Sequence, residues 1–219
     1  MHGYGSKKES FYYQINFLSA YFKVTAPDFP CFGASECSGE PWAVDDYADW
    51  LIDFMQKSGV QKPHILAHSF GARVAIKLLA RDCSVADRVI ITGGAGLVKE
   101  RSPRYMRQVT AYRRIKKLFP KFAEKHFGSE EYRKLSPIMK ESYKKIVNED
   151  LREYAKKITN PVYLLYGRDD TVTPPSEEGE TFHSLIGGSR FETMDGGHFC
   201  FSEHPDLFNK KILNFLSEE

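Results

Sequence analysis

The sequence has no long hydrophobic run, no strong net charge and few cysteines. None of its apolar stretches approaches the ~20 residues that a membrane-spanning helix needs, so we predict no membrane partner. The polar, glycine-bearing first ten residues do not resemble a secretory signal. The cysteines Cys31, Cys37, Cys83 and Cys200 lack metal-ligand spacing. We therefore predict no metal site, reduced thiols and a cytoplasmic protein.

The net charge of +2 hides an uneven distribution along the chain. Residues 99–157 hold 18 Lys and Arg against 8 Asp and Glu, whereas the remainder holds 13 against 21. Such a break in composition indicates a separate structural unit. Its basic residues recur with aromatics at helical spacing, which favours a solvated helical surface over a nucleic-acid site. We predict no nucleic-acid partner.

Strand and helix signals alternate along the rest of the chain, which predicts an α/β fold with a mostly parallel sheet flanked by helices. The predicted helices cover 10–22, 44–58, 72–81, 175–185 and 205–216, and the predicted strands cover 22–26, 64–67, 88–92, 161–166 and 189–193. Residues 97–158 show no strand run. We predict that they form a helical cap inserted after the strand at 88–92, with residues 1–96 and 159–219 as the core.

The pentapeptide Ala67-His68-Ser69-Phe70-Gly71 is the most informative local feature. It lies at the junction of a predicted strand and a predicted helix, where a nucleophile elbow is found. Small residues two before and two after Ser69 let strand and helix pack closely. The serine oxygen is then held at a helix N-terminus, where backbone N–H groups stabilise a developing oxyanion.

Two further residues complete a possible catalytic set. A serine hydroxyl is a poor nucleophile without an adjacent base, and that base needs an orienting group. Asp170 follows the strand at 161–166, and His198 follows the strand at 189–193. Because residues beyond the carboxyl ends of parallel strands converge on one edge of a sheet, we expect Ser69, Asp170 and His198 to meet.

Five segments of the sequence resemble motifs of the α/β-hydrolase superfamily at matching intervals. They are His2-Gly3-Tyr4-Gly5, the elbow at Ser69, the Gly-x-x-Asp motif ending at Asp170, Gly-Gly-His at 196–198, and the loop at 27–35, where the family usually has Gly in place of Cys31. The resemblance covers almost the whole chain and is weakest in the predicted cap. It implies an α/β-hydrolase fold.

The resemblance also implies a role for each matching residue. Ser69 would attack a carbonyl carbon, His198 would take its proton and return it to the leaving group, and Asp170 would hold the histidine tautomer. The backbone N–H of Phe70 would be one oxyanion donor. The second would come from the His-Gly-Tyr loop, with the Tyr4 N–H the first choice.

Competing residues surround these candidates. Asp169 adjoins Asp170, but its spacing favours a turn or surface role. His204 opens the last helix and reads as structural, and His64 and His183 lie in a strand and a helix without a serine-directed context. For His68, inside the elbow, packing and substrate contact both remain open.

A serine at the elbow predicts a hydrolase for a small carboxylic ester, thioester or related acyl substrate, through an acyl-enzyme and without metal or organic cofactor. Aromatic residues of the cap are candidates for the wall of an acyl pocket or for the cap's own core. They are Tyr105, Tyr112, Phe119, Phe122, Phe127, Tyr132, Tyr143 and Tyr154.

The chain begins at the predicted oxyanion loop, which family members precede with a strand between those at 22–26 and 64–67. Four explanations stay open: a misassigned start, a shortened form, a partner chain in the slot, or direct pairing of the flanking strands. A homo-oligomer would also supply an edge. The alternative function is a catalytically impaired, hydrolase-like binding or assembly protein.

Overall fold

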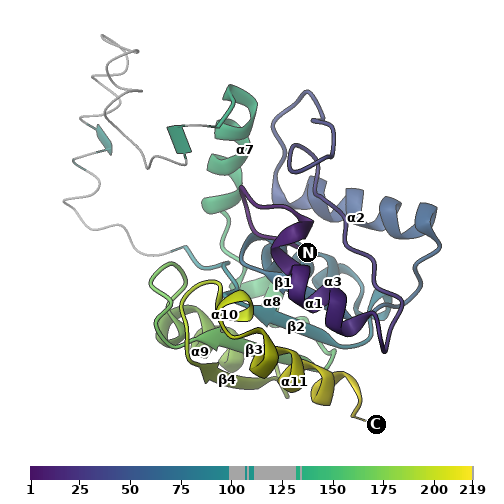
Figure 1. Ribbon diagram of the computed structural model, residues 1–219. Helices are drawn as coiled ribbons and strands as arrows, with labels where there is room; N and C mark the ends of the chain where they lie inside the picture. The colour runs from purple at the N-terminus through teal and green to yellow at the C-terminus, as the bar shows by residue number, and fades with distance from the viewer. Residues whose placement is uncertain (99–106, 108, 111–131, 134, 219) are drawn as a thin grey trace.

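A parallel sheet between two helical layers forms the centre of the molecule (Figure 1). The computed structural model describes residues 1–98, 107, 109, 110, 132, 133 and 135–218. In chain order, its elements are η1 (Lys8–Phe11), α1 (Tyr12–Leu18), α2 (Val44–Ser58), β1 (Ile65–His68), α3 (Phe70–Arg81), η2 (Cys83–Val85), β2 (Val89–Thr92), α7 (Pro137–Val147), α8 (Arg152–Ala155), β3 (Val162–Gly167), η3 (Pro175–Gly179), α9 (Glu180–Leu185), β4 (Arg190–Met194), α10 (Cys200–Glu203) and α11 (Pro205–Leu216).

The described strands form one sheet in the order β1-β2-β3-β4, and each neighbouring pair is parallel. Ile65 lies opposite Val89, and Val89 opposite Val162, so β1, β2 and β3 run in step. Their carboxyl ends therefore meet at one edge, as expected. The α/β class and the parallel sheet flanked by helices are confirmed.

Alternation along the inner strands divides the core into two clusters. Ile91 and Leu164 face the side covered by α2, α3, α8 and α9, whereas Ile90 and Leu165 face the side covered by α1, α10 and α11. Both faces of β2 and β3 are buried, so these strands read as continuous apolar runs rather than alternating ones. This burial is the main stabilising contribution to the sheet.

The helices predicted at 44–58 and 205–216 have the predicted bounds, and each has one terminus of a common type. Gly59 ends α2 in the left-handed conformation with φ 66°, and Pro205 opens α11. The predicted helix at 10–22 is confirmed only in part, since η1 and α1 end at Leu18.

The predicted strand at 22–26 is wrong. Its residues belong to no strand, and residues 23–27 make no backbone hydrogen bond within the described part of the chain. Direct pairing with β1, one of the four explanations left open, is therefore contradicted. An extended segment becomes a strand only when a neighbour completes its hydrogen bonds, and β1 does not lie beside it as a partner.

The predicted cap lies largely outside the described residues, and so do its aromatics at 105, 112, 119, 122 and 127. The described end of the predicted cap contacts the core: Arg73 of α3 donates to the carbonyls of Ile146, in α7, and Glu149, just after it. Leu151 and Ala155 are buried in the core cluster beneath α3. These contacts anchor the return of the chain to the sheet, while the bounds of a cap stay a prediction.

Cys31 and Cys37 form a disulfide, which contradicts the expectation of four reduced thiols; Cys83 and Cys200 are free. Metal-ligand spacing and the lack of an export signal do not reveal such a pairing. The fold adds a tight loop, in which Cys31 has φ 71° and its N–H donates to the carbonyl of Glu36 at 3.1 Å, so that the two thiols face each other.

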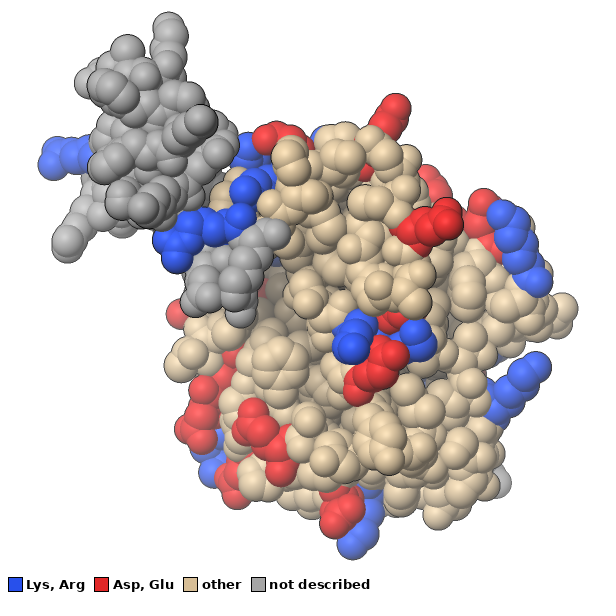
Figure 2. Space-filling view, turned by 45° about the horizontal axis from the view of Figure 1, so that its top comes forward, with Lys and Arg blue, Asp and Glu red and all other residues tan. Residues whose placement is uncertain are grey.

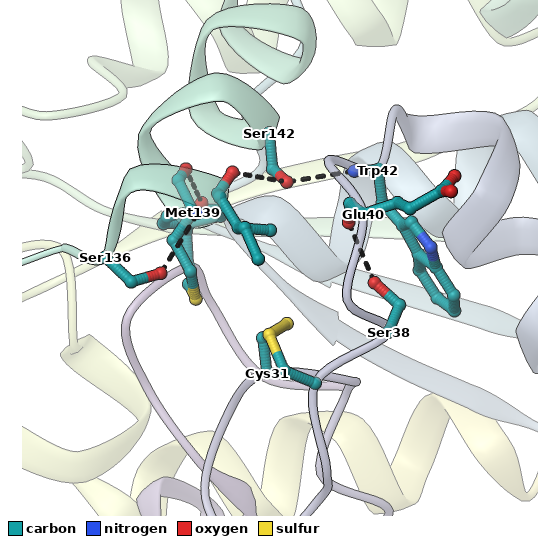
Figure 3. The surroundings of a disulfide bond; sticks show 10 residues. Cys31, Ser38, Glu40, Trp42, Ser136, Met139 and Ser142 are labelled. Carbon is teal, nitrogen blue, oxygen red and sulfur yellow. Dashed lines mark hydrogen bonds between the residues drawn. A yellow bond between two sulfur atoms is a disulfide. The ribbon is translucent and has the colours of Figure 1, made fainter.

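Figure 3 shows α7 beside the disulfide loop. The Ser142 hydroxyl accepts a hydrogen bond from the Trp42 N–H at 2.9 Å, and the Ser136 hydroxyl caps α7 by accepting from the Met139 N–H. Lys145 donates to the carbonyl of Pro41. The loop after the disulfide and α7 therefore hold each other in place.

On the face shown in Figure 2, basic and acidic side chains of the described residues are interspersed rather than segregated. None of the described helices combines the length and the apolar character required to cross a membrane.

Candidate active site

Ser69 occupies a strained turn between β1 and α3. Its backbone angles, φ 52° and ψ −108°, lie outside the regions that residues other than glycine usually adopt. Gly71, two residues on, lets the N-terminal loop approach this turn, because a Cβ there would lie 2.5 Å from the carbonyl oxygen of Met1. The predicted strand–turn–helix geometry is confirmed, and it presents the Ser69 side chain beyond the end of the strand.

The N–H of Phe70 lies at the first position of α3. The first N–H groups of a helix have no acceptor within the helix. The next turn closes when Ala72 donates to the Ser69 carbonyl at 3.1 Å. The Phe70 N–H is therefore at the position where a helix N-terminus favours a negatively charged oxygen, and its part in an oxyanion hole stays a prediction.

Asp170 lies just beyond β3 and is buried. Its Oδ1 accepts from the N–H groups of Val172 at 2.8 Å and Thr173 at 2.9 Å, and its Oδ2 accepts from the Thr173 hydroxyl and from His198 Nδ1, both at 2.8 Å. Burial alone would raise the pKa of Asp170, but the hydrogen bonds from His198 and Thr173 lower it below its ordinary value. The carboxylate is therefore held ionised.

His198 follows β4, and its side chain is 11% exposed. Its Nδ1 donates to Asp170, which leaves Nε2 as the nitrogen able to accept a proton. Gly93, just after β2, has φ 52°, and a Cβ at this position would lie 3.0 Å from His198 Nδ1. The glycine is needed both for its turn and for the close approach of the imidazole.

Two structural features bring Ser69 and His198 into one neighbourhood. The loop that begins at Gly93 touches both, since Ala95 donates to the Ser69 carbonyl at 3.4 Å. The ring of His68, beside Ser69 in sequence, lies 4.6 Å from the ring of His198. Within the described part of the chain, no hydrogen bond joins the Ser69 hydroxyl to His198. Such bonds are often long in enzymes without substrate and tighten on binding.

His68 was a packing or substrate-contact candidate, and the structure gives it a packing role. Its Nε2 donates to the carbonyl of His198 at 2.9 Å, and its ring packs against Phe199 and Phe201. Burial lowers the pKa of His68 to about 3, so the ring is neutral. His68 therefore braces the backbone that carries the imidazole of His198.

The predicted oxyanion loop reaches Ser69 from the side of β1. The Met1 nitrogen donates to the Leu66 carbonyl at 2.6 Å, and the Met1 carbonyl accepts from the His68 N–H at 3.0 Å. A Cβ on Gly3 would lie 3.4 Å from the Cβ of Ser69, so this loop runs directly against the nucleophile.

Tyr4 is fixed by an aromatic cluster. Its ring lies 4.9 to 5.5 Å from the rings of Phe32, Phe70 and Tyr143, each in an edge-to-face arrangement. Its hydroxyl donates to the carbonyl of Met139 in α7 at 2.7 Å. Tyr143 therefore lies beside the candidate site, whereas its predicted part in an acyl pocket stays a prediction.

The His2 side chain joins the Met1–Tyr4 loop to the segment at Phe29. Phe29 donates its N–H to His2 Nε2 at 3.0 Å, so the ring carries its proton on Nδ1, which donates to the Gly3 carbonyl at 2.8 Å. Burial lowers the pKa of His2 to about 4. A neutral ring is the only form that serves both bonds.

The competing residues are either exposed to solvent or in contact with residues outside the candidate site. Asp169 is exposed, and His204 is exposed at the start of α11. His64 lies near Asp87, and His183 contacts Ser189.

Thr173 and Gly93 were missed by the sequence analysis. The Asp-Thr-Val-Thr run after β3 carried the signal for Thr173, since a hydroxyl three residues after a carboxylate closes a turn on it. The Gly-Gly pair after β2 carried a weaker signal for Gly93.

The comparison with known protein families decides the family. The model described as "Alpha/beta hydrolase family" matches residues 1–211. The chain belongs to the alpha/beta hydrolase family.

Two curated members of similar length align with most of this hydrolase. "Uncharacterized hydrolase YugF" of Bacillus subtilis is 23% identical over 99% of the chain and 88% of that protein. "Putative carbamate hydrolase RutD" of Pantoea ananatis is 22% identical over 94% of the chain and 82% of that protein.

Among solved structures, an esterase from Exiguobacterium antarcticum superposes with a TM-score of 0.79 at 22% identity, covering 100% of this chain and 90% of that one. At this identity the likeness shows the fold alone. Family and fold together make this chain an alpha/beta hydrolase with hydrolase relatives.

Proposed function

We propose that this hydrolase cleaves a small carboxylic ester, thioester or related acyl compound through an acyl-enzyme on Ser69. The observation that carries the proposal is the buried Asp170–His198 pair at 2.8 Å, beside a serine held in a strained elbow. The carboxylate on Nδ1 fixes the ring orientation and the tautomer that leaves Nε2 free to take a proton, which is what a serine nucleophile requires.

The reaction we propose has two halves. In the first, His198 Nε2 takes the hydroxyl proton as Ser69 attacks the carbonyl, and the alcohol, thiol or amine leaves with that proton. In the second, His198 takes a proton from the water that attacks the acyl-enzyme, and it returns this proton to the Ser69 oxygen as the carboxylic acid leaves. The N–H groups of Phe70 and Tyr4 would bind the oxyanion in both, each supplying about 3–4 kcal/mol of transition-state stabilisation.

The names of the relatives support acyl chemistry and leave the substrate open, because esters and carbamates differ in the atoms bonded to the carbonyl carbon. The aromatic side chains around Tyr4 favour an apolar acyl group of modest size. A cytoplasmic location and self-association stay predictions.

The test is hydrolysis of p-nitrophenyl acetate and butyrate by the wild type, by Ser69→Ala and by the control Ser202→Ala, whose serine is exposed in α10. We expect Ser69→Ala to lower kcat by at least about 10³-fold and to abolish labelling by a fluorophosphonate, with Ser202→Ala unchanged. Equal rates for the wild type and Ser69→Ala would overturn the proposal.

A catalytically impaired binding or assembly protein is the second candidate. The observation that favours it is the oxyanion loop, whose two backbone bonds to the sheet both come from Met1. Fluorophosphonate labelling separates the candidates. An impaired protein would bind acyl compounds without a burst of p-nitrophenol and without labelling.

A further inference from the structure

Thr173 is buried beside the Asp170–His198 pair and contacts both side chains. Its hydroxyl donates to Asp170 Oδ2 at 2.8 Å and lies 3.2 Å from His198 Nδ1. Nδ1 itself lies 2.8 Å from the same carboxylate oxygen. Only 3% of Thr173 is exposed, so bulk water does not compete for these contacts. The three polar groups form a closed triangle.

The local sequence holds this hydroxyl in place. The Thr173 N–H donates to Asp170 Oδ1 at 2.9 Å, which closes the turn after β3. Pro174 follows, and a residue before proline is restricted to extended backbone conformations. The Pro174 carbonyl in turn accepts from the N–H groups of Glu177 and Glu178. Because threonine is also β-branched, few rotamers remain open to its side chain.

The protons available in the triangle assign a role to each group. An ionised carboxylate only accepts hydrogen bonds, and a hydroxyl has a single proton to donate. Since Thr173 gives that proton to Asp170 Oδ2, its oxygen acts as an acceptor toward His198. Nδ1 of His198 therefore faces two acceptors. Without a proton it would face two sets of lone pairs, so both acceptors select the tautomer that carries its proton on Nδ1.

Other residues hold the backbone of His198. Glu203 Oε2 accepts from the N–H of Gly197 at 2.8 Å, and His68 Nε2 donates to the carbonyl of His198 at 2.9 Å. A Cβ at Gly93 would lie 3.0 Å from Nδ1, so the ring fits closely on that side. These contacts place the backbone and one face of the ring, whereas rotation of the ring about its side-chain bonds depends on the partners of Nδ1.

We propose that Thr173 is a positioning residue, whose hydroxyl holds the imidazole of His198 against Asp170 in the tautomer and orientation that present Nε2 to Ser69. This inference rests on the proposed function. Because the hydroxyl is buried and engaged by Asp170 and His198, it acts through the imidazole and does not bind substrate. Its removal should therefore lower kcat and leave KM unchanged.

Thr173→Val tests the proposal, because valine keeps nearly the same shape and removes the hydroxyl. On p-nitrophenyl acetate we expect kcat to fall about tenfold or more, with KM within about twofold of the wild type. Thr173→Ser retains the hydroxyl, so its kcat should stay within about threefold of the wild type. The matched control is Thr171→Val, at an exposed threonine two residues earlier, which should leave both constants unchanged.

A second measurement does not depend on activity. A ring with one acceptor fewer leaves Asp170 more often, and its Nδ1 proton then exchanges with water. The low-field proton resonance of the Asp170–His198 bond should therefore be at least about threefold broader in Thr173→Val, and narrow again in Thr173→Ser. Each variant is checked by circular dichroism. If valine prevents folding, Thr173→Ala takes its place with the same expectations.

A double-mutant cycle separates positioning from a general structural role. In the Asp170→Asn background the hydroxyl no longer has a carboxylate against which to hold the ring. Adding Thr173→Val there should lower kcat by no more than about a further twofold. A residue that merely supports the fold would cost the same in both backgrounds.

Three results would overturn the proposal. They are Thr173→Val with the kcat and the line width of the wild type, Thr173→Ser with the same loss as Thr173→Val, and an undiminished loss in the Asp170→Asn background. A failure confined to the Thr173 variants leaves the proposed function standing. Wild-type activity in Ser69→Ala would instead remove the proposed function, and this inference with it.

Discussion

The candidate site draws on two regions that are supported differently. Asp170 and His198 follow β3 and β4, which are paired with each other along their length, and four hydrogen bonds fix the carboxylate. The Met1–Tyr4 loop instead reaches Ser69 along the free edge of β1. The acid–base pair and the oxyanion loop therefore depend on different contacts. A substitution that displaces one of them should leave the geometry of the other intact.

The largest effect is expected on the paired side. Asp170→Asn keeps the shape but loses the charge that fixes the tautomer of His198, so kcat on p-nitrophenyl acetate should fall about 10³- to 10⁴-fold. Asp169→Asn, at the exposed neighbour, should stay within about twofold. Equal losses in the two variants would remove Asp170 from its proposed role.

A change at Gly71 tests the loop side. A Cβ there would meet the Met1 carbonyl oxygen at 2.5 Å, so Gly71→Ala should displace the loop and lower kcat about 10²- to 10³-fold, the effect of one lost oxyanion donor. The low-field proton resonance of the Asp170–His198 bond should persist. Gly187→Ala, with open space around it, is the control. Loss of that resonance would show that the two regions are not separable.

Acid should weaken both regions, through His2 under the loop and through His68 against the backbone of His198. Burial lowers their pKa values to about 4 and about 3 from an ordinary 6.5. Between these values and pH 6.5 the unfolded state binds more protons, so stability rises with pH and levels off above 6.5. Going from pH 7 to pH 5 should cost about 2 kcal/mol for each histidine.

Urea unfolding at several pH values measures this loss. His2→Gln and His68→Gln should each flatten the pH dependence, while His204→Gln, at an exposed histidine, should not. A profile that is unchanged in both variants would contradict the neutral state of these rings.

The smallest effect is expected from the disulfide. Its loop spans a sequence separation of only 6, so Cys31→Ser with Cys37→Ser should lower the free energy of unfolding by about 1–2 kcal/mol. Because this loop carries the Phe32 ring against Tyr4, kcat should fall only a fewfold. Thermal unfolding with and without reductant, with Cys83→Ser as control, measures the difference.

Much of the paired side could be predicted from local patterns. The apolar runs of β1, β2 and β3, the small residues around Ser69 and the stop at Gly59 are consequences of chain chemistry within a few residues. The same holds for Asp170, whose turn is closed by its own neighbours Val172 and Thr173.

The loop side could not be predicted in this way. The alternation at 22–26 is that of a strand, but a strand exists only with a partner, and that partner is not local. Likewise, the packing role of His68 depends on its contact with His198, which is distant in sequence. The facing of Cys31 and Cys37 depended on a turn with positive φ that composition does not reveal.

By itself, then, the sequence determined the α/β class, the chain order of the motifs and the candidate residues for hydrolase chemistry, because periodicity, turn residues and functional groups can be recognised within short segments. Only the tertiary structure decided how these residues meet. It showed which side of the site is held by a complete ladder and which lies on a free edge, since hydrogen bonding between strands is satisfied in space and not along the chain.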